Sequence, residues 1–252
     1  MRPTPPQGIA SHTRARRAAK AAQRHTAESV TRMSADASTV LEQLSKNILV
    51  PVVVLDDAAH ALPLANALAL GGLPVAEVTF RTAAAEESIR IMADRGGIVL
   101  GAGTVLTVDH VDRAVAAGAD YIVSPGLSRA VVERAQEHGV AVLPGAVTAT
   151  EIQAALELGL NTVKFFPAET SGGASAIKAL SAPFGGLKFV PTGGISAANL
   201  ATYLEIDAIA AVGGSWMVDK KLVNAGQFDR IVELTAQAVS LARSLRPASV
   251  NA

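Results

Sequence analysis

The feature that most constrains the fold is a unit that repeats along the chain from about residue 47. Each unit consists of a short apolar run, a small or polar turn, and a longer amphipathic stretch. Nearly continuous apolar runs of this kind are typical of parallel strands covered by helices. Eight such runs occur, at Ile48–Leu55, Val75–Phe80, Ile98–Val105, Tyr121–Pro125, Ala141–Val147, Thr162–Phe166, Lys188–Thr192 and Ala208–Val212.

Eight strands that alternate with helices predict an α/β protein with the (β/α)8 TIM barrel architecture, in which all eight strands are parallel. A doubly wound open sheet is the second candidate, because it explains the alternation, but it explains the count of eight less well. Helix-length stretches separate the strands, among them Ala58–Leu70, Ala84–Arg95, Val108–Ala117, Arg129–His138 and Gly226–Arg243.

Local signals support the predicted helices. Thr148 and Glu151 have the spacing of a capping box, in which the hydroxyl and the carboxylate satisfy each other's backbone N–H groups. Gly118, Gly139 and Gly159 each follow a helical stretch, where a residue of left-handed conformation often ends the helix.

The first part of the chain differs in charge from the rest. Residues 1–33 contain seven Lys and Arg residues against the single acidic Glu28, although the whole chain is neutral. We expect residues 1–44 to be a basic, disordered leader and residues 45–246 to be the barrel domain. The leader lacks the apolar centre of a secretory signal. It is a basic tail, a transit-like leader, or upstream sequence that is not translated, with Met33 as the true start; the first and last of these are favoured.

The composition excludes several classes of function. With 22 basic and 22 acidic residues, the chain has no overall basic field for nucleic acid. It has no Cys, and no apolar stretch reaches the roughly 18 residues of a membrane span. The three histidines beyond the leader, His60, His110 and His138, fall on separate helices, which disfavours a metal site. We therefore expect a cytoplasmic protein that binds neither nucleic acid nor membrane.

The second strand carries charge inside an apolar run. With a period of two, Glu77, Thr79 and Arg81 share one face of the strand. A carboxylate in such a place is costly unless a partner compensates it. Glu77 is therefore either half of a structural ion pair or a functional group at the carboxyl end of the barrel, where active sites of this fold lie.

Two lysines compete for a catalytic role. Lys164 stands inside an apolar run, and burial disfavours the charged form of an amine. A neutral amine is the nucleophile that attacks a ketone to form an imine. Lys188 has the same spacing to a following Pro, but a Gly-Gly-Leu turn directly precedes it, which places it at the amino end of its strand. That end of a barrel serves stability, so Lys164 is the preferred candidate.

Small residues end the later strands. Gly193 and Gly194 follow the seventh strand, and Gly214 and Ser215 follow the eighth. Barrels bind phosphate at this place, where backbone N–H groups converge on the anion. The alternative is a pair of ordinary tight turns. Simple packing or turn chemistry also accounts for Thr104 in Gly-Ala-Gly-Thr and for Pro125 in Ser-Pro-Gly.

Six ordered motifs together resemble the 2-keto-3-deoxy-6-phosphogluconate (KDPG) aldolases, many of which also cleave 4-hydroxy-2-oxoglutarate. The similarity covers roughly residues 45–220. The motifs are Glu-Val-Thr-Phe-Arg-Thr (77–82), Gly-Ala-Gly-Thr-Val (101–105), Ser-Pro-Gly (124–126), Lys-Phe-Phe-Pro-Ala-Glu (164–169), Pro-Thr-Gly-Gly-Ile-Ser (191–196) and Gly-Gly-Ser-Trp (213–216).

The resemblance implies a Schiff-base aldolase that acts on a phosphorylated keto acid without a metal or other cofactor, in the Entner–Doudoroff pathway, and a homotrimer. It implies Lys164 as the Schiff-base residue and Glu77 as the general acid and base. The remaining roles that it implies are the carboxylate contact for Arg81 and Thr104, the aldehyde face for Pro125, packing beside the imine for Phe166, and the phosphate site for Gly193, Gly194, Gly214 and Ser215.

Three alternatives remain open at this point. A 6-phosphogalactonate aldolase would share the lysine but has a different motif on the second strand. A phosphate-binding barrel of another type, such as an epimerase, would form no imine. A non-catalytic scaffold would have no need of Glu77 and Lys164 inside the barrel.

Overall fold

The computed structural model describes residues 37–246, and eight parallel strands and their covering helices run through these residues. The strands are β1 (Leu49–Val53), β2 (Val75–Thr79), β3 (Val99–Gly103), β4 (Tyr121–Val123), β5 (Ala141–Leu143), β6 (Thr162–Phe165), β7 (Lys188–Pro191) and β8 (Val212–Gly214). The α-helices are α2 (Ala61–Leu70), α3 (Ala85–Arg95), α4 (Val108–Ala116), α5 (Arg129–His138), α6 (Ala149–Glu157), α7 (Gly173–Ser181), α8 (Leu200–Leu204), α9 (Lys220–Asn224) and α10 (Phe228–Leu245). The 3-10 turns are η1 (Ala58–His60), η2 (Glu169–Ser171) and η3 (Trp216–Val218).

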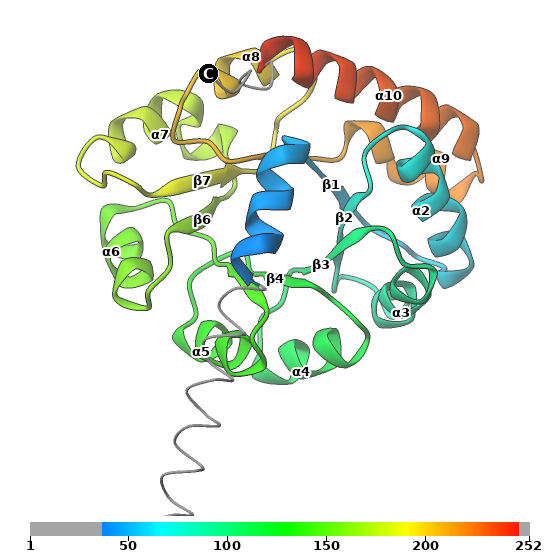
Figure 1. Cartoon of the computed structure of the whole chain (residues 1–252), viewed down its shortest axis with the longest axis horizontal. Coiled ribbons are helices and arrows are strands. Elements are labelled where there is room, and N and C mark those ends of the chain that lie inside the picture. Colours follow the sequence, from blue (N-terminus) through cyan, green and yellow to red (C-terminus); the bar gives the residue numbers. More distant parts are fainter. Residues whose placement is uncertain (1–36, 247–252) are drawn as a thin grey trace, which may run out of the picture.

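The strands form a curled, all-parallel arrangement with the helices outside it (Figure 1). Six of them pair in the order β5-β4-β3-β2-β1-β8, and β6 pairs with β7. Isolated bridges join the two sheets, Gly145 with Lys164 on the β6 side and Thr192 with Gly213 on the β7 side. The order follows the chain without the reversal of a doubly wound sheet, so the open-sheet alternative is not supported.

All eight predicted strands are present, but several are shorter than predicted and one is shifted. The eighth was predicted at Ala208–Val212, but β8 begins at Val212. Residues 206–209 form a turn instead, in which the N–H of Ile209 donates to the carbonyl of Ile206. An apolar stretch alone does not distinguish such a turn from a strand, which explains the error.

The helix signals are confirmed. Thr148 and Glu151 form a capping box at the start of α6, with both reciprocal hydrogen bonds present. Gly118, Gly139 and Gly159 have φ values of +97°, +73° and +76°, as predicted for residues that follow helices.

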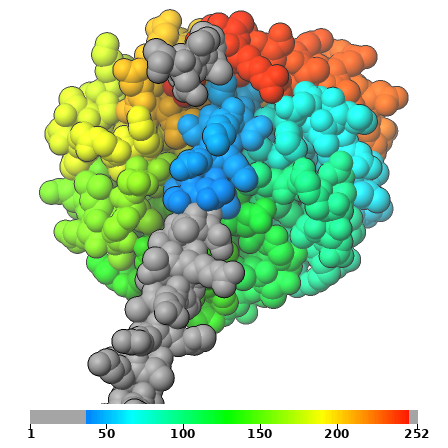
Figure 2. Space-filling model, in the orientation of Figure 1, coloured from blue at the N-terminus to red at the C-terminus, as the bar shows by residue number. Residues whose placement is uncertain are grey.

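A helix over residues 37–47 precedes β1 and lies across one face of the molecule, drawn in blue in Figures 1 and 2. Leu44 on this helix is 1% exposed and belongs to the hydrophobic core. The expected leader extended to residue 44, so its last residues were wrongly assigned as disordered. An apolar side chain every third or fourth residue, Val40, Leu41 and Leu44, gives them a face to bury. Residues 1–36 of the leader, including Met33, lie outside the described residues.

Candidate active site

Lys164 and Glu77 meet inside the curled sheet. Lys164 is the third residue of β6 and Glu77 the third residue of β2, and these strands are not hydrogen-bonded neighbours. The Lys164 Nζ donates to Glu77 Oε1 at 2.9 Å. Their side chains are 7% and 4% exposed, so two opposite charges are paired almost out of contact with water. A pair of this kind combines a nucleophilic amine with a group that can take its proton.

Strand β3 makes room for the carboxylate. A Cβ atom at Gly103 would lie 2.3 Å from Glu77 Oε1, and one at Gly101 would lie 2.2 Å from the Tyr121 ring. Only glycine at these two positions leaves room for the Glu77 and Tyr121 side chains. Tyr121 is fully buried and donates to the carbonyl of Ala76 at 3.0 Å. Burial, and then the negative charge of Glu77, raise the pKa of the Tyr121 hydroxyl well above its usual value, so it stays a donor.

The backbone of Lys164 is fixed from both sides. Its N–H donates to the carbonyl of Pro144 at 2.9 Å, and its carbonyl accepts from Ala146 N at 2.8 Å. On the other side it is in register with Val190 of β7. The Phe166 ring lies beside the amine, with its centroid 5.3 Å from Nζ. These contacts hold the amine at a set depth.

Lys188 lies at the other end of its strand, as predicted. It is the exposed first residue of β7, in register with Thr162. Its Nζ donates to the carbonyl of Asp207 at 2.9 Å. It therefore fastens a loop at the amino end and has no access to the buried pair.

The predicted carboxylate contacts follow the ends of β2 and β3. Arg81 is exposed, and within residues 37–246 its guanidinium makes no hydrogen bond or ion pair. Thr104 is half-buried and has a φ of +58°, which is unusual for a residue other than glycine. A guanidinium without a protein partner, just beyond the strand that carries the buried carboxylate, is free to bind an anionic ligand.

Pro125 lies at the end of β4, next to the strand that borders Lys164. A Cβ atom at Gly145 would lie 2.0 Å from the Pro125 carbonyl oxygen, and Gly145 itself bridges to Lys164. Glycine at position 145 thus lets the Pro125 carbonyl lie close to the segment that bridges to Lys164. Turn chemistry alone, the alternative interpretation of the sequence, does not require this contact.

The two glycine-rich turns are neighbours. Thr192 forms a bridge with Gly213, and a Cβ atom at Gly213 would lie 2.2 Å from Thr192 Oγ1. In the described part of the chain, the N–H groups of Gly193, Gly194 and Ser215 have no acceptor. Three backbone donors thus remain available in adjacent turns, an arrangement that suits an anion.

The sequence did not identify Thr192 as a site residue. Its hydroxyl is buried between these turns and has no hydrogen-bond partner within residues 37–246. A buried hydroxyl without a partner is costly. The available signal was its place in the Pro-Thr-Gly-Gly motif, directly before the turn.

The chain matches the family described as KDPG and KHG aldolase over residues 40–234. It is 46% identical over 204 residues to a 2-dehydro-3-deoxy-phosphogluconate aldolase of Treponema pallidum, covering 81% of this chain and 97% of that protein. This chain belongs to the KDPG and KHG aldolase family. The family match begins in the helix that precedes β1 and includes all residues of the site described above.

Solved structures of KDPG aldolases have the same fold. The 2-keto-3-deoxy-6-phosphogluconate aldolase of Zymomonas mobilis ZM4, with 3-phosphoglycerate, has a TM-score of 0.76 and 40% identity, and the match covers 86% of this chain and all of that one. The KDPG aldolase of Legionella pneumophila, with pyruvate captured as a covalent carbinolamine intermediate, has a TM-score of 0.74 and 38% identity over 75% of this chain and 93% of that one.

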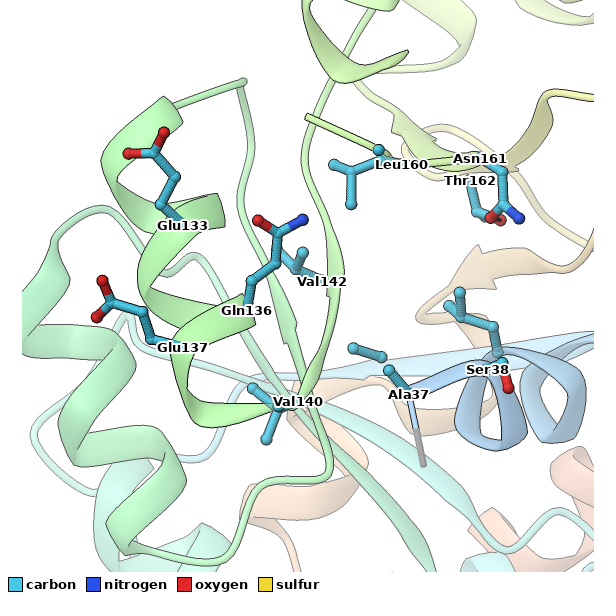
Figure 3. Close-up of a pocket in the computed structure, with 14 residues that line it drawn as sticks. Ala37, Ser38, Glu133, Gln136, Glu137, Val140, Val142, Leu160, Asn161 and Thr162 are labelled. Carbon is cyan, nitrogen blue, oxygen red and sulfur yellow. Dashed lines mark hydrogen bonds between the residues drawn. The ribbon is translucent and has the colours of Figure 1, made fainter. Parts of the chain in front are cut away.

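A pocket at the opposite end of the strands is separate from the aldolase site (Figure 3). It lies between α5 and the helix at residues 37–47, and its lining includes Ala141 and Thr162, the first residues of β5 and β6.

Within residues 37–246, no three His, Cys, Asp or Glu residues lie close enough together to hold a metal ion. None of the helices in this part of the chain has the length and apolar character of a membrane span.

Proposed function

We propose that the protein is a class I aldolase that cleaves 2-dehydro-3-deoxy-6-phosphogluconate to pyruvate and glyceraldehyde 3-phosphate, with Lys164 as the Schiff-base residue. The observation that carries the proposal is the buried contact of 2.9 Å between Lys164 Nζ and Glu77 Oε1. Family membership and the relatives named for this activity support it.

The paired geometry supplies the first proton transfer. An amine attacks a ketone only in its neutral form, so the ammonium form has to lose a proton first. At hydrogen-bonding distance, Glu77 can take one proton as Lys164 Nζ attacks the C2 ketone. Glu77 then returns this proton to the hydroxyl of the resulting carbinolamine, which leaves as water while the nitrogen lone pair forms the C2 iminium.

The iminium drives the bond cleavage. It accepts the electron pair of the C3–C4 bond as Glu77 removes the C4 hydroxyl proton, so C4 becomes the aldehyde of glyceraldehyde 3-phosphate. The enamine that remains takes this proton from Glu77 at C3. Water then adds to C2 and releases pyruvate and the free amine. The imine is itself the electron sink, so the proposed chemistry requires no cofactor.

The remaining residues would hold the substrate along the carboxyl ends of the strands. We assign the C1 carboxylate to Arg81 and Thr104, and the aldehyde face to Pro125, while Phe166 packs beside the imine. We assign the phosphate to Gly193, Gly194, Gly214 and Ser215, and add Thr192 because of its unpartnered hydroxyl. Fixed donors on rigid strand ends provide the orientation on which such catalysis depends.

The proposal extends to the architecture and its setting. We propose that β6 and β7 complete an eight-stranded barrel with the other six strands, supported by the bridges on either side. A domain over residues 45–246, together with the helix before it, would assemble as a homotrimer. The exposed Leu106 and Val108, 55% and 40% accessible, offer an apolar contact for it. The substrate class suggests a cytoplasmic enzyme of the Entner–Doudoroff pathway.

Borohydride trapping tests the proposed nucleophile. Pyruvate with borohydride should add one reduced pyruvyl group to the wild-type protein, and peptide mass spectrometry should locate it on Lys164. Lys164→Ala should form no adduct, whereas the matched change Lys188→Ala should form it as the wild type does. An adduct that maps elsewhere, or that persists in Lys164→Ala, would contradict the assignment.

Turnover of related substrates tests the specificity. Cleavage coupled to pyruvate detection should be faster for the gluconate-derived substrate than for its C4 epimer from galactonate, and 4-hydroxy-2-oxoglutarate should be cleaved to pyruvate and glyoxylate. Faster cleavage of the epimer would favour the 6-phosphogalactonate alternative.

A further inference from the structure

The turn at Gly193 and Gly194 is held by groups outside the site described above. The Gly193 carbonyl accepts from Glu169 N at 3.1 Å, and the Gly194 carbonyl accepts from Asn199 Nδ2 at 3.1 Å. Both carbonyls of the turn are thus bound to protein, while both of its N–H groups lack an acceptor among the described residues. The turn is therefore oriented as a donor of hydrogen bonds.

Glu169 supports the turn with its side chain as well. A Cβ atom at Gly194 would lie 2.6 Å from Glu169 Cγ, so the turn packs directly against the glutamate stem. The preceding residue, Ala168, donates its N–H to the Thr192 carbonyl at 2.8 Å. The loop after β6 and the turn after β7 are therefore joined, and the loop begins at Phe166, beside the Lys164 amine.

Tyr203 holds the carboxylate of Glu169, the residue that packs against the turn. It lies on α8, is 1% exposed, and its hydroxyl donates to Glu169 Oε1. Burial, then the hydrogen bond and the charge of Glu169, raise the pKa of the Tyr203 hydroxyl, so it remains protonated and keeps donating. The bond ties the Glu169 carboxylate to α8.

We propose that Tyr203 and Glu169 are positioning residues for the phosphate group. They do not touch the substrate. Tyr203 holds Glu169, and Glu169 holds the Gly193–Gly194 turn, whose N–H groups have no acceptor within residues 37–246. The inference rests on the proposed function, because it gives that turn the phosphate of the substrate.

The two substrates of the proposed enzyme separate positioning from general stability. The phosphorylated keto acid uses the turn, whereas the second substrate, 4-hydroxy-2-oxoglutarate, has no phosphate. Tyr203→Phe should therefore raise the KM of the phosphorylated substrate about tenfold, equivalent to about 1.4 kcal/mol of binding. The unphosphorylated substrate should keep its wild-type KM, and kcat should be unchanged for both substrates.

Matched variants define the mechanism. Glu169→Gln keeps an acceptor for Tyr203 and should preserve the ratio of the two KM values, whereas Glu169→Ala should change it as Tyr203→Phe does. Tyr121→Phe removes an equally buried tyrosine hydroxyl on β4, and any effect of it should fall on both substrates alike. A Tyr203→Phe enzyme with an unchanged ratio, or with both KM values raised equally, would overturn the inference.

A second measurement separates this inference from the proposed function. Inorganic phosphate should raise the melting temperature of the wild-type protein and should do so less in Tyr203→Phe. If the wild type forms no pyruvate adduct but keeps this difference, the proposed function fails and the positioning role stands. If phosphate stabilises both proteins equally, or neither of them, the positioning role is refuted, even where trapping at Lys164 succeeds.

Discussion

Lys164 and Lys188 stand on paired strands in almost the same local sequence, Lys-Phe-Phe-Pro and Lys-Phe-Val-Pro, yet they lie in opposite environments. The Lys164 side chain is 7% exposed and bound to a carboxylate. Lys188 is exposed and bound to a backbone carbonyl. The difference is their place along the strand, the third residue against the first, and not the residues around them.

The same contrast extends to the two ends of the strands. Within residues 37–246, the carboxyl end holds a buried ion pair, N–H groups without acceptors and an unpartnered hydroxyl, all of which are costly for stability. The amino end holds the helix at residues 37–47 and hydrogen bonds that fasten loops. In α/β proteins with parallel strands, binding and catalytic groups gather at the carboxyl ends of the strands, so mutations at the two ends should differ in kind.

The largest effect should come from the charge of the buried carboxylate. Glu77→Gln removes the proposed proton acceptor, so kcat should fall by about 10²–10⁴ because a positioned base contributes this much. Pyruvate should still be trapped on Lys164, more slowly. Glu133→Gln, on α5 near the amino end, is the matched control and should retain full turnover. Equal turnover of the two variants would remove Glu77 from its role.

Replacing a glycine at the carboxyl end of the strands should impair catalysis, whereas replacing a glycine at the amino end should not. A Cβ atom at Gly103 would lie 2.3 Å from Glu77 Oε1, whereas one at Gly185, before β7, would meet no atom of residues 37–246 within 4 Å. Gly103→Ala should push the carboxylate away from Lys164 and lower kcat/KM about 10²-fold, as a shift of about 1 Å can. Gly185→Ala should be neutral. Normal kinetics in Gly103→Ala would show that the carboxylate position is not critical.

These residues also show how far the sequence predicted the molecule. Eight apolar runs predicted the strands, and the motifs predicted that Lys164 and Glu77 share a site, which their contact now supports. Only the structure reveals the contacts that depend on how segments distant in the sequence pack together. Periodic patterns in the sequence do not predict the space that Gly103 leaves for Glu77 or the hydrogen bond from Tyr203 to Glu169. Each of these contacts joins residues that lie far apart in the chain.

A substitution of Arg246 should change stability without changing catalysis, because Arg246 binds the loop at the amino end of the strands. Its guanidinium donates to the carbonyls of Leu204, Ile206 and Ile209, which line the loop before β8. Arg246→Ala should lower the free energy of unfolding by about 1.5–3 kcal/mol, the usual range for hydrogen bonds to a charged group. In chemical denaturation, the exposed Arg243→Ala should unfold as the wild type does. A large loss of kcat in folded Arg246→Ala would contradict the separation between the ends.

The smallest effect should be seen in the pH dependence of stability. One carboxylate at the amino end of the strands and one at the carboxyl end should contribute to stability with opposite dependences on pH. Burial raises the pKa of Asp120, before β4, above its usual 3.8, and the hydrogen bond from Leu100 N offsets this only in part. Burial also acts on Glu151, after β5, but hydrogen bonds from Val147 N and from Thr148 outweigh it and lower its pKa below 4.5.

The signs follow from which state binds protons more tightly. The folded state holds the Asp120 proton more tightly, so that contribution to stability is complete below pH 3.8 and is lost as pH rises through the folded pKa. The Glu151 contribution is present above pH 4.5 and is lost as pH falls through its lowered pKa. In urea unfolding from about pH 3 to about pH 7, Asp120→Asn should therefore gain stability relative to the wild type as pH rises, and Glu151→Gln should lose it. Parallel pH profiles for the two variants would show that the two carboxylates do not differ in this way.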